Sequence, residues 1–501
     1  MKASQPIDPE FIEADVMATL SIWSQGNCKE VSFAAPQPLC EILEQAGISG
    51  LRPCGGRGQC GKCAVTLCGQ VSEPNEAEKK AGVRLACQAE ILGDAQVFLP
   101  TAAELQQIQT ESDTELSDFT PGEGIGAAVD IGTTTVVLRR YDLRTGQLLG
   151  QSAMINPQTG VAADVMGRIG AAMEGKLPLL RSQITDALAL LYQQAGGGAD
   201  KAVITGNTTM LYLLTGMDPS CLSHAPFEAD TLFDTDASVL NIPTYLPPCM
   251  NAFVGADISC AVLASRMCRD KISLLCDIGT NGEIALWKDG VLFVTSTAAG
   301  PAFEGALISC GCSSIPGAID KVWSENGQIH IHTIADREAV GICGSGLIDA
   351  VAVLLKEEIM DETGAMEDDM TLAPGVTLLQ KDIRALQLAK AAIAAGIQTL
   401  LEGSGTTFGQ IETFYLAGGF GSHLDLHSAA AIGLIPRELI PKAKVIGNAA
   451  LAGASRLLLE ETSLSAVRTI ARNSRHYNLG GNPIFNEYYM EQMLFPYDES
   501  I

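Results

Sequence analysis

The sequence has little positive charge and no long apolar run. Its 501 residues include 32 lysines and arginines against 58 aspartates and glutamates, which gives a formal net charge of -26. Nucleic acids and anionic membrane surfaces bind clustered Lys and Arg, so we expect neither as a partner. A membrane-spanning helix needs about 20 apolar residues, and the sequence has no apolar run even of 18.

A secretory signal is also missing, because residues 1–11 carry Pro6 and Pro9 and no apolar core. The 15 cysteines include one dense group, and the others are scattered. Scattered thiols fit a reducing, cytoplasmic compartment, where most are small buried side chains. The scattered cysteines are Cys28, Cys40, Cys68, Cys221, Cys249, Cys260, Cys268, Cys276, Cys310, Cys312 and Cys343. Cys310 and Cys312 have no matching pair beside them, which argues against a second metal site.

The dense group is Cys54-Gly-Gly-Arg-Gly-Gln-Cys60-Gly-Lys-Cys63, and Cys87 follows after 23 further residues. The spacing C-x5-C-x2-C is one residue longer in its first gap than the plant-type ferredoxin motif. Glycines let backbone N–H groups turn toward the sulfides of a cluster. Zinc and disulfides are the alternatives, but structural zinc usually takes two closely spaced pairs of ligands, and only Cys60 and Cys63 have that spacing. The loop therefore favours a [2Fe-2S] cluster.

Around this loop, residues 16–100 resemble a ferredoxin domain with the longer loop of adrenodoxin-like members. The resemblance implies a β-grasp fold and the metal ligands Cys54, Cys60, Cys63 and Cys87. Ahead of the loop we expect strands at 18–23 and 31–33 and a short helix at 39–46. Arg57 and Lys62 should raise the potential of the cluster, because positive charge favours its reduced form.

A second pattern occurs twice. The first copy is Asp130-Ile-Gly132-Thr133-Thr134, which lies between two apolar strands. The second copy, 147 positions later, also lies between two apolar strands and reads Asp277-Ile-Gly279-Thr280-Asn281-Gly282. Backbone N–H and hydroxyl groups of such turns can bind phosphate oxygens. A single copy would be an ordinary turn or cap, but two copies at domain spacing predict a clamp around one nucleotide.

These hairpins resemble those of the superfamily of acetate and sugar kinases, heat-shock proteins and actin, abbreviated ASKHA. Three further segments fit it: Gly206-Asn207 after a strand, Gly344 before a helix, and Gly418-Gly419-Phe420 after a buried strand. The resemblance covers about residues 125–470 and implies a duplicated α/β ATPase. The whole chain would then be a multidomain α/β and α+β protein.

The resemblance also implies roles for individual residues. Asp130 and Asp277 would hold the water shell of Mg2+, a hard cation that takes few protein oxygens, and orient the attacking water. The residues that would bind ATP are Gly132, Thr133, Thr134, Gly206, Asn207, Gly279, Thr280, Asn281, Gly282, Gly344, Gly418, Gly419 and Phe420.

Two other segments need an interpretation. Apolar residues at helical spacing from Ile383 to Leu400 predict a core helix with Lys390 at its margin. Asp425-Leu-His427 begins like the Asp-x-His-x-x-Gly motif of corrinoid-binding domains, but Ala430 stands where the glycine belongs. We reject this motif because its structural context is missing, so any cobalamin belongs to a partner.

A [2Fe-2S] domain ahead of such an ATPase resembles one family, the reductive activators of corrinoid enzymes. Matching stretches include Asn156-Pro-Gln158, Gly206-Asn-Thr-Thr-Met210, Ala299-Gly-Pro-Ala-Phe-Glu304 and Leu416-Ala-Gly-Gly-Phe-Gly421. The resemblance implies ATP-dependent transfer of one electron to the Co(II) form of a corrinoid methyl-transfer protein, which regenerates Co(I). It also implies an upstream donor such as a ferredoxin or flavodoxin, and it is compatible with a homodimer. Glu304 and residues 156–169 are candidate docking contacts, with loop packing inside the ATPase as the equal alternative.

The predicted units are an extension (1–15), the ferredoxin domain (16–100), a solvated linker (101–124), two ATPase halves (125–270 and 271–480) and a tail (481–501). Two other functions share parts of this pattern. An activator of the 2-hydroxyacyl-CoA dehydratase type also joins this ATPase fold to electron transfer, but with a [4Fe-4S] cluster between subunits. An ASKHA kinase with an accessory ferredoxin domain would phosphorylate a small acceptor.

Overall fold

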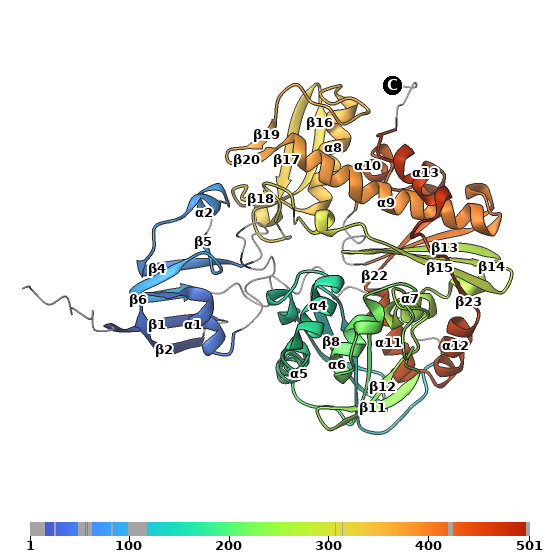
Figure 1. The fold of residues 1–501 in the computed structure, drawn as a ribbon, viewed down its shortest axis with the longest axis horizontal. Helices are drawn as coiled ribbons and strands as arrows, with labels where there is room; N and C mark the ends of the chain where they lie inside the picture. Colours follow the sequence, from blue (N-terminus) through green and yellow to red (C-terminus); the bar gives the residue numbers. More distant parts are fainter. Residues whose placement is uncertain are drawn as a thin grey trace, which may run out of the picture.

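The computed structural model describes residues 16–24, 27–48, 56, 58, 63–81, 84–98, 118–305, 307–312, 314–418 and 424–496. A small N-terminal unit lies to one side of a larger body that holds the remaining elements (Figure 1). Several predicted residues lie outside these ranges, namely Cys54, Arg57, Cys60, Lys62, Gly419 and Phe420.

The N-terminal unit is a mixed sheet with strand order β2-β1-β6-β4-β5 in its described part, and β3 pairs with β6. Its strands are β1 (Val16–Ser24), β2 (Asn27–Ala35), β3 (Gln37–Pro38), β4 (Ala64–Val71), β5 (Arg84–Leu85) and β6 (Glu90–Phe98), and its helices are α1 (Leu39–Gln45) and α2 (Glu76–Ala81). Strand β1 runs antiparallel to β2 and parallel to β6. The buried side of α1, with Leu39, Ile42 and Leu43, joins the core over this sheet. The predicted hairpin and helix are thus confirmed.

The larger body contains two sheets built on one plan. The first has the order β11-β12-β10-β7-β8-β9 and the second β22-β21-β13-β14-β15-β23 among the described residues. The first comprises β7 (Ile125–Ile131), β8 (Thr135–Asp142), β9 (Leu148–Ile155), β10 (Lys201–Gly206), β11 (Thr235–Val239) and β12 (Ile242–Leu246). The second comprises β13 (Ile272–Ile278), β14 (Gly282–Lys288), β15 (Val291–Thr297), β21 (Thr413–Ala417), β22 (Ala443–Gly447) and β23 (Ser474–His476).

The strand pairings show the duplication directly. In the first sheet β7, β8 and β9 form an antiparallel meander, and β10 lies parallel to β7. In the second sheet β13, β14 and β15 form the same meander, and β21 lies parallel to β13. The central strands are apolar along most of their length because both faces of each sheet are covered. The sequence repeat is therefore a structural repeat.

Two helices exchange places between the halves. Helix α7 (Ala256–Ser265) follows the first sheet in sequence, but it packs in the core of the second with α12 (Glu461–Arg472). Helix α11 (Ala449–Leu459) comes near the end of the chain, yet it packs on β7 and β8 of the first half. The two helices also pack closely on each other at Gly453, where a Cβ would lie 2.0 Å from the carbonyl oxygen of Cys260. The two halves are therefore not contiguous in sequence.

The remaining elements complete the two halves. Helices α4 (Val165–Ala171), α5 (Leu177–Gln194) and α6 (Thr208–Thr215) belong to the first half (Figure 1). The second carries β16 (Ala318–Glu325), β17 (Gln328–Thr333), β18 (Gly341–Ile342), α8 (Gly344–Lys356), β19 (Met370–Ala373), β20 (Val376–Leu378), α9 (Gln380–Ser404), α10 (Leu426–Ala431) and α13 (Pro483–Glu491). Among the described residues no helix has the length and apolar character to cross a membrane.

Helix α9 corrects one prediction. The core helix is present, but Lys390 is fully buried and does not lie at its margin. Its Nζ donates to the carbonyl oxygen of Leu494 and lies 5.0 Å from the ring centre of Phe495. Burial lowers the pKa of Lys390 to about 7. The lysine holds the C-terminal segment against α9, a long-range contact that helical spacing could not reveal.

The end of the predicted linker is attached to the ATPase. Thr120 N–H donates to the carbonyl oxygen of Leu459 (2.9 Å), and Gly122 N–H donates to that of Leu143 (2.7 Å). Phe119 packs against the cluster of apolar side chains around α11. The chain is therefore fixed to the larger body from about residue 119 onward, a few residues before β7 begins.

The contact between α7 and α11 gives the first testable prediction. Gly453→Ala should destabilise the protein by about 1 to 3 kcal/mol, because the added methyl group meets backbone of α7 and forces the helices apart. Gly170→Ala in α4 is the matched control, since a Cβ there has open space and alanine favours a helix over glycine by about 1 kcal/mol. Thermal denaturation measures the stability of both variants. Equal melting temperatures for Gly453→Ala and Gly170→Ala would contradict the close contact between α7 and α11.

Candidate functional site

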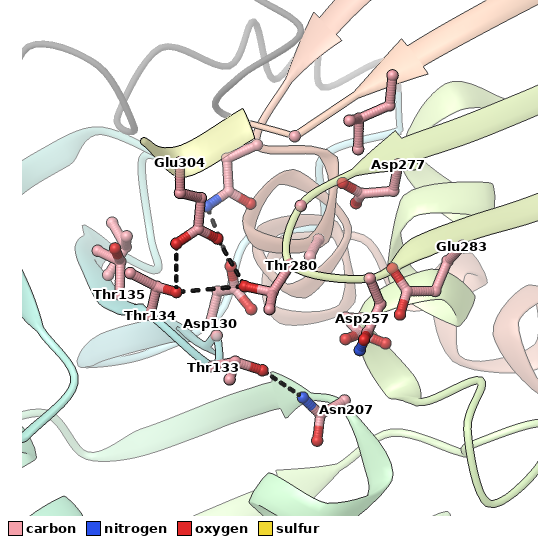
Figure 2. A pocket seen from close by; sticks show the side chains of 18 residues that line it. Asp130, Thr133, Thr134, Thr135, Asn207, Asp257, Asp277, Thr280, Glu283 and Glu304 are labelled. Carbon is pink, nitrogen blue, oxygen red and sulfur yellow. Dashed lines mark hydrogen bonds between the residues drawn. The ribbon is translucent and has the colours of Figure 1, made fainter. Parts of the chain in front are cut away.

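A pocket lies between the two repeated hairpins (Figure 2). Its walls come from the turns after β7 and β13, the start of α6 and α7, the residue that ends η5 (Pro301–Glu304), and the segment before α11. The residues that line it are Asp130, Gly132, Thr133, Thr134, Thr135, Val137, Asn207, Asp257, Asp277, Ile278, Gly279, Thr280, Asn281, Glu283, Glu304, Gly418, Asn448 and Ala450.

The two repeated aspartates occupy equivalent places. Asp130 is near the end of β7 and Asp277 near the end of β13, each at the centre of its sheet. Asn448 caps α11 with its side-chain oxygen and donates its amide to Asp130 Oδ2 at 3.1 Å. Gly418 adopts φ +93°, and a Cβ there would lie 2.6 Å from Asp277 Oδ1. A glycine is required at this point because the strand after α9 passes directly beside the carboxylate.

Burial raises the pKa of four carboxylates in the pocket, and neighbouring charges add to the effect for three of them. Burial raises the pKa of Asp130 to about 7, and the charges of Asp257 and Asp277 add to the effect, while the Asn448 hydrogen bond opposes it. Burial likewise raises the pKa of Asp277 to about 7 and of Asp257 to about 6. Burial and the charges of Asp257 and Asp277 raise the pKa of Glu283 well above its usual value.

This charge fits a divalent cation. The described lining holds these four carboxylates and Glu304 but no lysine or arginine. Mg2+ is bound in proteins by one or two carboxylates, with waters and substrate phosphates completing its shell. The pocket therefore has the oxygen donors that Mg2+ requires, and a bound cation would offset the mutual repulsion of the acids.

Hydroxyl and amide groups line the side of the first hairpin. Asn207 caps α6 through Met210 N–H and donates its amide to Thr133 Oγ1 at 3.1 Å. Behind the turn, the buried guanidinium of Arg168 donates to the carbonyl oxygen of Thr133 and to that of Ala162. These bonds hold the turn in one conformation, which is what a preformed phosphate site requires.

Glu304 joins the two hairpins. Thr134 donates its hydroxyl to Glu304 Oε2 at 2.9 Å, and Thr280 donates to Oε1 at 2.6 Å. The two hydroxyl oxygens are 3.4 Å apart, and Figure 2 shows the carboxylate directed between them. Of the two alternatives for Glu304, the structure favours packing inside the ATPase over an exposed docking contact.

The segment 156–169 is buried at its two ends and exposed in much of its middle, at residues 160, 163, 164, 166 and 167. Asn156 is buried and donates to the carbonyl oxygen of Gly132 at 2.8 Å, and Gln158 and Arg168 are buried beside it. This packing supports the turn after β7 from behind. Asp425, which begins the rejected corrinoid motif, caps α10 by accepting from Ser428 N–H at 2.7 Å.

The predicted residues reach the pocket to different extents. Ten line it, namely Asp130, Gly132, Thr133, Thr134, Asn207, Asp277, Gly279, Thr280, Asn281 and Gly418. Gly206, Gly282 and Gly344 are not part of its described lining. Gly206 is needed for close packing, since a Cβ there would lie 2.7 Å from the carbonyl oxygen of Ile131. Gly344 begins α8, with Cys343 as its cap. Gly419 and Phe420 lie outside the described residues.

Three pocket acids were missed as nucleotide-site residues: Asp257, Glu283 and Glu304. Asp257 stands in the first turn of α7, directly after Gly255 and Ala256. Gly255 lets α7 approach the turn between β10 and α6, because a Cβ there would lie 2.4 Å from Asn207 Cα. The sequence signal was a glycine followed by an acidic residue at a helix start, which is common at ordinary helix ends.

In the N-terminal unit, two of the four predicted cluster ligands are described. Cys63 Sγ and Cys87 Sγ lie 3.2 Å apart, which is well beyond a disulfide bond of about 2.05 Å. Two thiolates on one tetrahedral metal with bonds of about 2.3 Å lie about 3.8 Å apart, so a small shift would let both reach one iron. Gly56, with φ +78°, accepts a hydrogen bond from the Gln88 side chain. These residues fit a cluster, and Cys54 and Cys60 lie outside the described residues.

Comparison with family models divides the chain into three parts. Residues 24–92 match a "2Fe-2S iron-sulfur cluster binding domain". Residues 125–270 match the "RACo middle region", and residues 271–500 match the "C-terminal domain of RACo the ASKHA domain". The protein is thus a ferredoxin-type domain fused to an ASKHA-type domain, as the resemblance implied.

Comparison with individual proteins is more specific. The chain is 35% identical over 439 residues to the "Corrinoid activation enzyme RamQ" of Eubacterium limosum, which covers 77% of this chain and 73% of the relative. It is 27% identical over 419 residues to the "[Co(II) methylated amine-specific corrinoid protein] reductase" of Methanosarcina barkeri, covering 74% and 77% of the two chains. A solved "Reductive activator for corrinoid,iron-sulfur protein" superposes with a TM-score of 0.69 at 27% identity, covering 95% and 98%. The chain belongs to the family of reductive activators of corrinoid proteins.

The raised pKa values predict how pH affects stability. Between the unfolded pKa of about 4 and the folded value of about 7 for Asp277, the folded protein binds more protons than the unfolded chain. The metal-free protein should therefore lose stability, with a lower melting temperature, as pH rises from 5.5 to 8.

Asp277→Asn should reduce this loss, because the amide carries no charge to repel its neighbours. Asp289→Asn, in the exposed turn after β14, is the control and should keep the wild-type pH profile. Mg2+ should restore stability at pH 8 in the wild type. A melting temperature independent of pH in metal-free protein would contradict the crowding of charge in this pocket.

Proposed function

We propose that this protein uses ATP hydrolysis to drive one-electron reduction of the Co(II) form of a corrinoid methyl-transfer protein to Co(I). The observation that carries this proposal is the combination of a ferredoxin-type unit with a two-hairpin carboxylate pocket in one chain of the corrinoid-activator family. A ferredoxin or flavodoxin would supply the electron. We place the activity in the cytoplasm, with a homodimer as the working assembly.

In this proposal, different residues of the pocket have different roles in ATP hydrolysis. Asp130 and Asp277 are positioned to bind the water shell of Mg2+, which polarises phosphate oxygens when bound. Thr133, Thr280 and Asn281 offer donors for the phosphates. Asp257 faces both hairpins from the start of α7 and is suited to orient the attacking water (Figure 2). Gly418 would border the nucleoside.

The N-terminal unit would carry the electron. A [2Fe-2S] cluster, when bound, supplies one electron at a time, and the proposed ligands are Cys54, Cys60, Cys63 and Cys87. The corrinoid partner's Co(II) accepts this electron and becomes Co(I). The overall balance is one electron from the upstream donor to cobalt, with ATP and water converted to ADP and phosphate.

ATP is needed because an ordinary coupling free energy between two sites shifts a reduction potential only slightly. A tenfold shift in a one-electron equilibrium corresponds to about 59 mV, so a coupling of roughly 1 to 3 kcal/mol moves a potential by about 40 to 130 mV. A larger difference in reduction potential between the cluster and the cobalt requires a change in the partner, such as loss of a cobalt ligand on docking. Hydrolysis would then separate the two proteins so that the activator can be used again.

Asp130→Asn tests the ATPase part of the proposal. The variant should lose about 100-fold in ATP hydrolysis and in ATP-dependent Co(I) formation, because removing a group that supports transition-state charge costs about 2.7 kcal/mol or more. Absorbance of Co(I), with reductant and a Co(II) corrinoid protein, measures the second activity. The EPR signal of the reduced cluster should not change, and Co(I) formation at the wild-type rate without ATP would contradict the proposal.

Cys87→Ala tests the electron-transfer part. Loss of one thiolate should remove the cluster and its visible absorbance, and Co(I) should no longer form. ATP hydrolysis should persist, because the nucleotide pocket lies in a different unit. Cys68→Ala, a change at an exposed thiol of the same unit, is the control and should keep the cluster. A variant that loses Cys87 and still reduces Co(II) would contradict the assignment.

A further inference from the structure

The inference concerns Glu304 and rests on the proposed binding of a nucleoside triphosphate between the hairpins. Glu304 accepts one hydroxyl proton from each half of the ATPase, from Thr134 at 2.9 Å and from Thr280 at 2.6 Å. Each carboxylate oxygen has its own donor. The side chain therefore makes a direct link between the turn after β7 and the turn after β13 (Figure 2).

The surroundings of this carboxylate form an anion site. Its hydroxyl donors belong to the two turns whose glycines, backbone and side-chain donors suit phosphate. The guanidinium of Arg168 lies behind the first turn, where burial lowers its pKa to about 9 and the charges of Asp164 and Glu304 oppose that shift. A carboxylate and a terminal phosphate oxygen are both anionic acceptors of short hydrogen bonds. Glu304 thus makes the contacts that a phosphate would need.

The hydroxyl groups of Thr134 and Thr280 cannot bind the Glu304 carboxylate and a phosphate at the same time. Each hydroxyl has one proton to donate, and both protons go to Glu304. The described lining adds four more carboxylates and no lysine or arginine. A phosphate that approached Thr134 and Thr280 with Glu304 still in place would meet a like charge at short range in a partly buried site.

We propose that Glu304 occupies the position of the terminal phosphate and must be displaced by it, so that a triphosphate breaks the link between the two hairpins and a diphosphate does not. A diphosphate ends before this position and leaves the link from Thr134 to Thr280 in place. A triphosphate replaces the link with its own bonds to both hairpins.

The chain around Glu304 is built to let this side chain move while its neighbours stay. Gly300 and Gly305 on either side have φ +78° and +76°, a backbone conformation open to glycine. Phe303 is buried in the core of the second half, and Ser309 is held by Asp382 through its N–H (2.8 Å) and its hydroxyl (2.9 Å). Gly305 also packs closely, because a Cβ there would lie 2.5 Å from the carbonyl oxygen of Cys312. The backbone is thus anchored at Phe303 and Gly305, so the displacement moves the Glu304 side chain alone.

The experiment measures nucleotide binding by titration calorimetry in the presence of Mg2+, with ADP and with a non-hydrolysable ATP analogue. Glu304→Ala and Glu304→Gln should each bind the analogue about tenfold more tightly than wild type, a change of about 1.4 kcal/mol, because no carboxylate has to be displaced. Their affinity for ADP should stay within about twofold. Glu438→Ala, which removes an exposed glutamate from the short helix η9 (Arg437–Lys442), is the control and should match wild type.

A second readout needs no nucleotide. Amide hydrogen exchange of the turns 132–135 and 279–282 should be faster in nucleotide-free Glu304→Ala than in wild type, since the link between the halves is lost. Exchange should be equal once the ATP analogue is bound.

The outcomes separate this inference from the proposed function. Weaker binding of the analogue by both Glu304 variants would mean that Glu304 helps to hold the phosphate or its metal, and would overturn the inference. An equal gain for ADP and the analogue would also overturn it, because the effect would then be one of overall charge. If wild type and variants all fail to bind either nucleotide, the proposed function itself fails. If wild type binds the analogue and the variants match it, only the inference on Glu304 fails.

Discussion

The burial of several acids in one pocket is the constraint on which the rest of the ATPase depends. Asp130, Asp257, Asp277 and Glu283 approach from both sheets and from α7, and burial raises the pKa of each. Such a set is stable without a cation only if some of its members are protonated or hydrogen-bonded. The Asn448 amide meets that need in part. A divalent cation with bound phosphates would offset the remaining charge.

The exchange of α7 and α11 explains how one pocket can have acids from both halves at fixed positions. Helix α7 leaves the first sheet and packs in the core of the second, while α11 returns from the end of the chain to cover the first. Their close approach at Gly453 makes the two helices a shared layer. Asp257 at the start of α7 and Asn448 before α11 are therefore carried by the elements that join the halves.

Much of the fold and about half of the site could be predicted from the sequence, for reasons that particular residues make clear. The repeated Asp-Ile-Gly-Thr turns are local patterns with a fixed geometry, so Asp130, Asp277 and their neighbours were placed correctly in one pocket. Asp257 and Glu283 escaped notice because their importance comes from long-range packing. Glu304 was singled out, but its partners Thr134 and Thr280 are 170 and 24 positions away. Gly206 was interpreted as a ligand contact and serves close packing against Ile131. The roles of the individual residues and the domain boundaries stay predictions.

Helix α11 makes contacts at both of its ends that connect two separate parts of the protein. Its first turn begins at Asn448, whose side chain holds Asp130, and the carbonyl oxygen of Leu459 at its other end accepts from Thr120. With 11 residues and a rise of 1.5 Å per residue, the helix is about 16 Å long. The helix therefore links the carboxylate pocket, which Ala450 lines, to the point from which the chain is fixed to the larger body. One helix thus serves both as a wall of the pocket and as the anchor of the segment ahead of the first sheet.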